Sequence, residues 1–336
     1  MFDKRLDGRS EPIVLPEVPI IDSHVHLYQS PVVRYLIDDY LADTRAGHDI
    51  RASVHIEIQA FARTTGPEAL RPLGEIEYAN GVGAMGASGV YGNCKVSAGI
   101  VGHVDLRRGD DVSSFLDQAM ALAPQRFKGV RQVAIDHPSE VPYRFITHRP
   151  PKGLLEDSRF LDGFKQIASR GLSFDAAVFH NQIPKVAALA AKFPNTPIVL
   201  NHIGTPMAMD MDANGRAQVF REWRDGIREL ARQPNAICKI GGFGLPFLGF
   251  DFIARTEVVY SADLAAAWQP YVTETLEAFG PARCMMASNF PQDGRACGFV
   301  PLWNALKRTV SDLTVDERLD LFFNTANRVY RLGVEM

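Results

Sequence analysis

Short apolar runs recur along the chain, and each has the length of a β-strand. They are rich in β-branched and aromatic residues, and longer polar or amphipathic stretches separate them. This pattern predicts eight strands, which cover residues 19–21, 52–58, 96–101, 129–135, 172–179, 197–200, 236–240 and 284–287.

Amphipathic helices fill several of the intervals between these runs. Asp157 or Ser158 can cap a helix that Gly171 ends, because the residues between them place apolar side chains on one face. A second helix begins near Pro184, since proline is favourable in a first helical turn, and a third covers residues 219–230.

The alternation of strands and helices favours a single (β/α)8 TIM barrel over residues 1–336, with residues 1–18 as an N-terminal extension. An open doubly wound sheet is the alternative, and it is disfavoured because no Gly-x-Gly-x-x-Gly directly follows an early strand. We expect two segments to be long loops over the mouth of the barrel: the glycine-rich segment 61–93 and the proline-rich segment 138–153.

The charge balance narrows the range of partners. The chain has 36 Lys and Arg against 39 Asp and Glu, so no basic excess favours nucleic acid or an anionic membrane. We expect neither a signal peptide nor a transmembrane helix, and the four scattered cysteines suit a reducing cytoplasm. The expected partner is a small-molecule substrate. Barrels of this size are often homo-oligomers, and no sequence feature decides for or against one.

The first strand ends in a His-x-His motif. Because side chains alternate along a strand, we expect Asp22, His24 and His26 on one face at the mouth. Two imidazoles there suit a metal ion or a polar ligand pocket, although an isolated pair is as often structural. His180 and His202 end the fifth and sixth strands and would point into the same cavity. Each of these two alone would more often be a hydrogen-bonded structural histidine.

Two cations lie inside predicted strands, where each needs a partner because an unpaired buried charge is costly. Arg131 is either paired with Asp22 or Asp175, or free to clamp a substrate carboxylate or a lactone carbonyl. Lys239 in the seventh strand presents the same alternatives. His55 lies midway along the second strand, and we interpret it as structural.

The eighth strand ends at Asn289, whose amide cannot act as a general base. Asp293 follows four residues later. Its carboxylate either reaches the mouth and activates water, or caps the next helix.

An ordered series of segments resembles the amidohydrolase superfamily, and within it the amidohydrolase-related branch that contains sugar-acid and dicarboxylate lactonases. The resemblance implies a (β/α)8 barrel that hydrolyses its substrate at the mouth. It places the histidine pair of the first strand at His24 and His26, the histidine of the sixth strand at His202, and the substrate-binding arginine of the lactonases at Arg131. The segments are 19–26, 71–75, 102–106, 127–132, 172–175, 199–204, 283–291 and 327–332.

Two positions depart from the family pattern. Asn201 stands where the sixth strand usually has an aspartate before its histidine. Asn289 stands where the eighth strand usually has the aspartate that binds metal and activates water. This second departure weakens the implied metal site and makes Asp293 the first substitute base to test. Some lactonases of this branch act without metal, so hydrolase activity remains the expectation.

We therefore expect a hydrolase that opens the ester bond of a small carboxylated or polyhydroxy lactone. The expected catalytic residues are His24, His26, His202 and Asp293. Substrate binding is assigned to Arg131, His180, Lys239 and Asn289. A divalent ion such as Zn²⁺ would be held by His24, His26 and His180. The alternatives are a metal-dependent decarboxylase that uses the same three histidines on zinc, a C–N amidohydrolase, and a non-catalytic binding protein.

Overall fold

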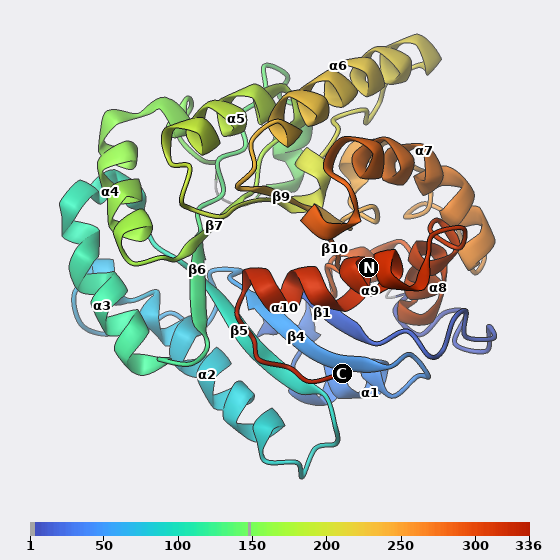
Figure 1. The fold of residues 1–336 in the computed structure, drawn as a ribbon, viewed down its shortest axis with the longest axis horizontal. Coiled ribbons are helices and arrows are strands. Elements are labelled where there is room, and N and C mark those ends of the chain that lie inside the picture. The colour runs from blue at the N-terminus through green and yellow to red at the C-terminus, as the bar shows by residue number, and fades with distance from the viewer. Residues whose placement is uncertain (1–3, 147–148) are drawn as a thin grey trace.

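The protein folds into a nearly closed barrel of parallel strands with helices around it (Figure 1). The computed structural model describes residues 4–146 and 149–336. The predicted (β/α)8 barrel is confirmed, and its sheet closes where Val25 pairs with Phe290 in parallel. The strands, in spatial order, are β1 (Ile20–Val25), β4 (Ile50–Ile56), β5 (Lys95–His103), β6 (Phe127–Arg131), β7 (Ser173–Ala176), β8 (Ile198–Leu200), β9 (Ala236–Ile240) and β10 (Cys284–Met286).

The three helices predicted between residues 157 and 230 are confirmed. Asp157 caps the first of them, because its side chain accepts hydrogen bonds from the backbone N–H groups of Arg159 and Phe160. The α-helices are α1 (Ile37–Thr44), α2 (Leu73–Ala87), α3 (Val112–Leu122), α4 (Ser158–Ser169), α5 (Ile183–Lys192), α6 (Ala213–Ala231), α7 (Ser261–Phe279), α8 (Phe299–Arg308), α9 (Val315–Leu319) and α10 (Thr325–Val329). The sequence did not predict a small antiparallel hairpin, in which β2 (Tyr28–Gln29) and β3 (Arg34–Tyr35) have two residues each.

The prediction that segment 61–93 is a long loop is wrong, because α2 occupies its centre. Glycine lowers helix propensity, and the glycines here suggested a loop. Gly83 and Gly86 allow close packing of the helix instead: a Cβ added at Gly86 would lie 2.9 Å from the backbone nitrogen of Val96 in β5. The described part of segment 138–153 is a loop with one 3-10 helix, η3 (Val141–Phe145), as expected. Residues 147 and 148 lie outside the described residues.

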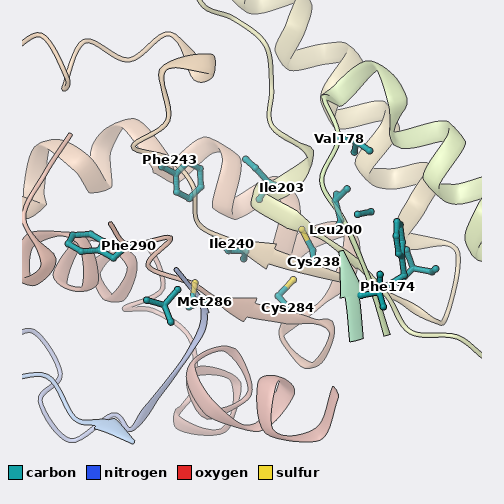
Figure 2. Packing of buried hydrophobic residues seen from close by; sticks show 14 of the residues in the cluster. Phe174, Val178, Leu200, Ile203, Cys238, Ile240, Phe243, Cys284, Met286 and Phe290 are labelled. Carbon is teal, nitrogen blue, oxygen red and sulfur yellow. The ribbon is translucent and has the colours of Figure 1, made fainter. Parts of the chain in front are cut away.

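The strands alternate between the helix layer and the barrel interior. Leu200, Cys238 and Cys284 lie on neighbouring strands and face the helices, where they are fully buried among other apolar side chains (Figure 2). The residues that alternate with them along each strand face the barrel interior. This alternation decides which side chains can reach a ligand inside the barrel.

An apolar cluster fills the amino-terminal end of the barrel, and we call it the floor cluster. Inward-facing strand residues meet side chains from the C-terminal segment there, including Phe323 and Tyr330. The backbone oxygen of Arg331 accepts a hydrogen bond from Lys128 at the start of β6, which places this segment across the amino ends of the strands. The strand members are Ile21, Ala52, Val54, Ile56, Val101, Val199, Ile237 and Met285.

The N-terminal segment packs back onto the barrel. Lys4 is buried, and its ammonium group donates hydrogen bonds to the backbone oxygens of Phe252 and Arg255. The segment therefore fixes the loop that follows β9. None of the helices in the described part of the chain combines the length and apolar character needed to cross a membrane.

Candidate active site

A β-bulge in the first strand decides which of its side chains face the mouth. The register against β4 shifts between Asp22 and Val25, so β1 carries one extra residue there. Asp22 consequently faces outward, where it accepts hydrogen bonds from the hydroxyls of Ser288 (2.6 Å) and Tyr40 (3.3 Å). The prediction that Asp22 shares a face with the two histidines is wrong. Burial raises the pKa of this carboxyl to about 6.

Three histidines and one arginine meet at the carboxyl end of the barrel, and we call them the mouth cluster. The Nε2 atoms of His24 and His26 lie 3.2 Å apart. The ring centroids of His24 and His202 lie 4.4 Å apart. Nη1 of Arg131 lies 3.3 Å from Nε2 of His24. All four side chains are nearly inaccessible to solvent.

The hydrogen bonds within the cluster fix the tautomers of two rings. Nδ1 of His26 lies 2.8 Å from the carbonyl oxygen of Ile56, which can only accept, so this nitrogen carries a proton. In the neutral ring Nε2 of His26 is then an acceptor, and His24 donates to it from its own Nε2. Nδ1 of His24 is left buried without a hydrogen-bond partner among the described residues.

All three rings of the mouth cluster are held neutral. Burial is the largest cause and lowers the pKa of His24 and of His26 well below the usual value. Burial, followed by the positive charges of Arg131 and Lys239, lowers the pKa of His202 to about 3. Neutral imidazoles keep a lone pair that can accept a proton from water.

Arg131 is paired with a residue that the sequence did not suggest. Its Nε donates to Oε1 of Glu57 at 2.7 Å, and its Nη2 donates to the backbone oxygen of Glu57. The expected partners, Asp22 and Asp175, are therefore wrong for this arginine. A bidentate clamp on a substrate carboxylate needs two free nitrogens, whereas only the Nη1 side of Arg131 faces the mouth cluster.

Lys239 is paired with an aspartate, which is the structural one of the two alternatives given for it from the sequence. Its ammonium group lies 2.7 Å from Oδ2 of Asp175, and both side chains are fully buried. The hydroxyl of Tyr330 donates to the same carboxylate at 2.9 Å, and the amide of Asn201 donates at 2.9 Å. Lys239 thus lies between the floor cluster and the mouth cluster, engaged by Asp175.

A strained backbone positions His202. This residue and the next, Ile203, have φ of 52°, in the left-handed region that is unfavourable for non-glycine residues. Gly242 after β9 packs against the ring, and a Cβ added there would lie 2.5 Å from Nδ1 of His202. Only glycine therefore allows the imidazole this close to the β9 loop.

Asp293 lies in the 3-10 helix η9 (Asp293–Arg295) beside this loop. Its carboxylate accepts from the amide of Asn289 at 2.7 Å and from the backbone nitrogen of Gly244 at 3.0 Å. Burial raises its pKa to about 7. Asn289 therefore positions a carboxyl group whose pKa lies near neutral pH, as a general base requires.

His180 lies apart from the mouth cluster. Its Nδ1 accepts from the backbone nitrogen of Met207 at 3.2 Å, and its Nε2 lies 3.7 Å from Glu222. Burial lowers its pKa to about 4. His55 faces α2, where its Nε2 lies 3.4 Å from Glu75, in keeping with a structural role.

The donors at the mouth do not fit a resident divalent ion. Within residues 4–146 and 149–336, no group of three His, Cys, Asp or Glu side chains has the arrangement needed to hold one. The positively charged Nη1 of Arg131 lies 3.3 Å from Nε2 of His24, so a fixed cation stands beside the atom that a metal ion would need. His180, the expected third ligand, is engaged elsewhere.

Sequence reasoning missed two residues of this region. Glu57 follows the apolar run of β4 directly, so the rule that selected the histidines at strand ends would also have found it. Tyr330 gave no such signal, because it reaches the interior from the C-terminal segment and not from a strand.

Comparison with known proteins agrees with this architecture. A family model described as Amidohydrolase matches residues 21–332. The chain belongs to the amidohydrolase family. A protein of Sinorhizobium fredii named uncharacterized protein y4mH is 30% identical to this amidohydrolase over 95% of its chain and 100% of the relative.

Two further relatives bear on the chemistry. An L-fucono-1,5-lactonase of Burkholderia multivorans is 28% identical to this amidohydrolase over 54% of its chain and 58% of the lactonase. The crystal structure of an amidohydrolase from Burkholderia multivorans with bound zinc has a TM-score of 0.71 at 23% identity, covering 94% of this chain and 100% of that one. The predicted resemblance is confirmed, and a lactone-ester hydrolase is the class of enzyme that these relatives support.

Proposed function

We propose that the protein hydrolyses the ester bond of a small lactone at the mouth cluster. The observation that carries this proposal is the convergence of three neutral histidines and an arginine at the carboxyl end of the barrel, where enzymes of this fold bind their substrates. The activity named for the Burkholderia multivorans lactonase supports the same reaction class.

Arg131 and His24 are the residues suited to hold the lactone carbonyl. Both direct N–H groups toward the same small region, because Nη1 of Arg131 lies 3.3 Å from Nε2 of His24. Donors fixed in a buried site stabilise the negative charge that develops on the carbonyl oxygen when water adds. Glu57 holds the arginine in place for this contact.

Asp293 or His202 removes the proton from the attacking water. Asp293 is suited to this task by its raised pKa. His202 has a buried Nδ1 without a partner among the described residues, but its lowered pKa makes it the weaker base. The water oxygen then bonds to the carbonyl carbon, and the ring C–O bond breaks. The proton passes to the alkoxide, so one lactone and one water give one hydroxy acid.

The zinc-dependent alternatives have less support from the geometry. A decarboxylase with His24, His26 and His180 as ligands needs the third histidine beside the other two, whereas it binds the backbone of Met207. The proposed hydrolysis therefore relies on the side chains of the mouth and Asp293. Chelator-treated protein is expected to keep its lactonase activity with substoichiometric zinc, and activity that returns only with added zinc would contradict this expectation.

A pH-indicator assay over a panel of carboxylated and polyhydroxy lactones tests the proposal. We expect turnover of at least one lactone by the wild-type protein and little by the His24→Ala variant. A folded wild-type protein that opens none of them would overturn the proposal and favour the non-catalytic binding protein.

A further inference from the structure

The cations that were expected to hold an anionic substrate group are already paired. Glu57 occupies Nε and Nη2 of Arg131, and Asp175 binds the ammonium group of Lys239 at 2.7 Å. A carboxylate on the substrate therefore needs another cation at the mouth. Arg295, at the end of η9, meets this need.

Arg295 lines a pocket of about 240 Å³ at the carboxyl end of the barrel. Its walls come from the segments that follow β6, β8, β9 and β10, which are the loops that carry function in this fold. The pocket adjoins the proposed base, since Arg295 shares the η9 turn with Asp293. Gly244, which binds Asp293, lies two residues before the wall segment that begins at Pro246. The apolar lining residues are Phe145, Met209, Pro246, Phe250 and Ile253.

The side chain of Arg295 makes no hydrogen bond or ion pair with any residue in the described ranges, although its Nε is buried. A buried guanidinium nitrogen without a partner is unfavourable, so a ligand oxygen would satisfy it. Arg144 on the rim differs in this respect, because it is exposed and paired with Asp210. That pairing also neutralises the one carboxylate among the residues lining the pocket.

We propose that this pocket is a subsite for a carboxylate carried on an apolar, planar part of the lactone, and that Arg295 binds the carboxylate. The inference rests on the proposed function for the identity of the substrate. The pocket is smaller than the ~300 Å³ of a whole-ligand site, so it holds only part of a molecule whose carbonyl lies at Arg131 and His24. Apolar walls beside a guanidinium favour a ring with a carboxylate over a polyhydroxy chain.

Binding of benzoate tests the subsite without turnover. Titration calorimetry should show saturable binding to the wild-type protein, weakened about tenfold in Arg295→Met and partly restored in Arg295→Lys. Benzyl alcohol, which keeps the ring and lacks the charge, should bind weakly and alike to the wild-type protein and Arg295→Met. Arg149→Met is the control, because Arg149 pairs with Glu140 outside the pocket lining, and this variant should bind benzoate as the wild type does. Benzoate that binds Arg295→Met as tightly as wild type, or does not bind wild type, would overturn the subsite.

Kinetics separate this inference from the proposed function. For a carboxylated lactone, Arg295→Met should raise KM about tenfold and change kcat less than twofold, while KM for an uncharged lactone stays the same. If no lactone is hydrolysed and benzoate still binds through Arg295, the function fails and the subsite stands. If lactones are hydrolysed with an unchanged KM in Arg295→Met, the function stands and the subsite fails.

Discussion

The floor cluster and the mouth cluster are both buried in the barrel interior, and they differ in polarity. Strands contribute to both from successive inward positions: β9 places Ile237 in the floor and Lys239 above it. The floor stabilises the fold by burying apolar surface, at about 25 cal/mol per Å². The mouth buries neutral histidines and charges, which cost free energy unless they are paired. The apolar floor that stabilises the fold and the polar mouth therefore occupy successive levels along the barrel axis, with the Asp175–Lys239 pair at their boundary.

The largest effect is expected at this boundary. Asp175→Asn leaves the buried ammonium group of Lys239 without its counter-charge, so the free energy of unfolding should fall by about 3–5 kcal/mol in urea titrations. Adding Lys239→Met should recover most of the loss. Glu156→Gln, which breaks an exposed ion pair with Lys185, is the control and should cost about 0.5 kcal/mol or less. Equal effects of the two single substitutions would contradict the boundary role.

Next comes a substitution confined to the mouth. His24→Ala should lower lactone turnover by about a hundredfold or more with the fold intact, because it removes a donor to the carbonyl. His48→Ala offers a matched control, since this buried histidine lies outside the barrel interior beside the backbone oxygen of Val300. It should cost stability and leave kcat nearly unchanged. Unaltered kinetics in His24→Ala would reject the site.

A smaller effect should follow from Tyr330→Phe at the floor. The change deletes one hydroxyl that donates to the Asp175 carboxylate, so unfolding should become easier by about 1.5 kcal/mol in thermal or urea denaturation. Turnover should stay within a few-fold of wild type. A large loss of kcat without a loss of stability would place Tyr330 in the chemistry and blur the division between the two clusters.

The smallest effect is a pH dependence in which activity rises with pH while stability falls. With the pKa of Asp293 raised to about 7, kcat/KM should rise about tenfold from pH 6 to pH 8 as the carboxylate ionises. The raised pKa also means that the folded state binds this proton more tightly than the unfolded state. The stability it contributes is therefore complete below pH 3.8 and is lost as the pH rises through about 7.

Asp293→Asn should remove both trends, because the amide does not titrate. Rate profiles and urea titrations over the same buffers measure them side by side. A rate profile that keeps its rise in Asp293→Asn would show that Asp293 is not the group whose ionisation controls the rate.

The sequence predicted the architecture well because hydrophobic runs repeat at barrel spacing, and it predicted the meeting of His24, His26 and His202 because parallel strands end at one rim. The predicted orientation of Asp22 is wrong because one inserted residue exchanges the two faces of a strand. No local sequence pattern indicates such a bulge. The glycine-rich helix α2 was not predicted because helix propensity describes isolated helices. In this protein, close packing against β5 stabilises the helix despite its glycines.

The hydroxyl that completes the Asp175 environment comes from a residue near the end of the chain, 155 positions away. During synthesis the strands that carry Asp175 and Lys239 leave the ribosome before Tyr330 does. Until residues 323–334 have been synthesised, the apolar side chains of the floor cluster stay uncovered, and exposed apolar surface of this kind makes a folding intermediate prone to aggregate.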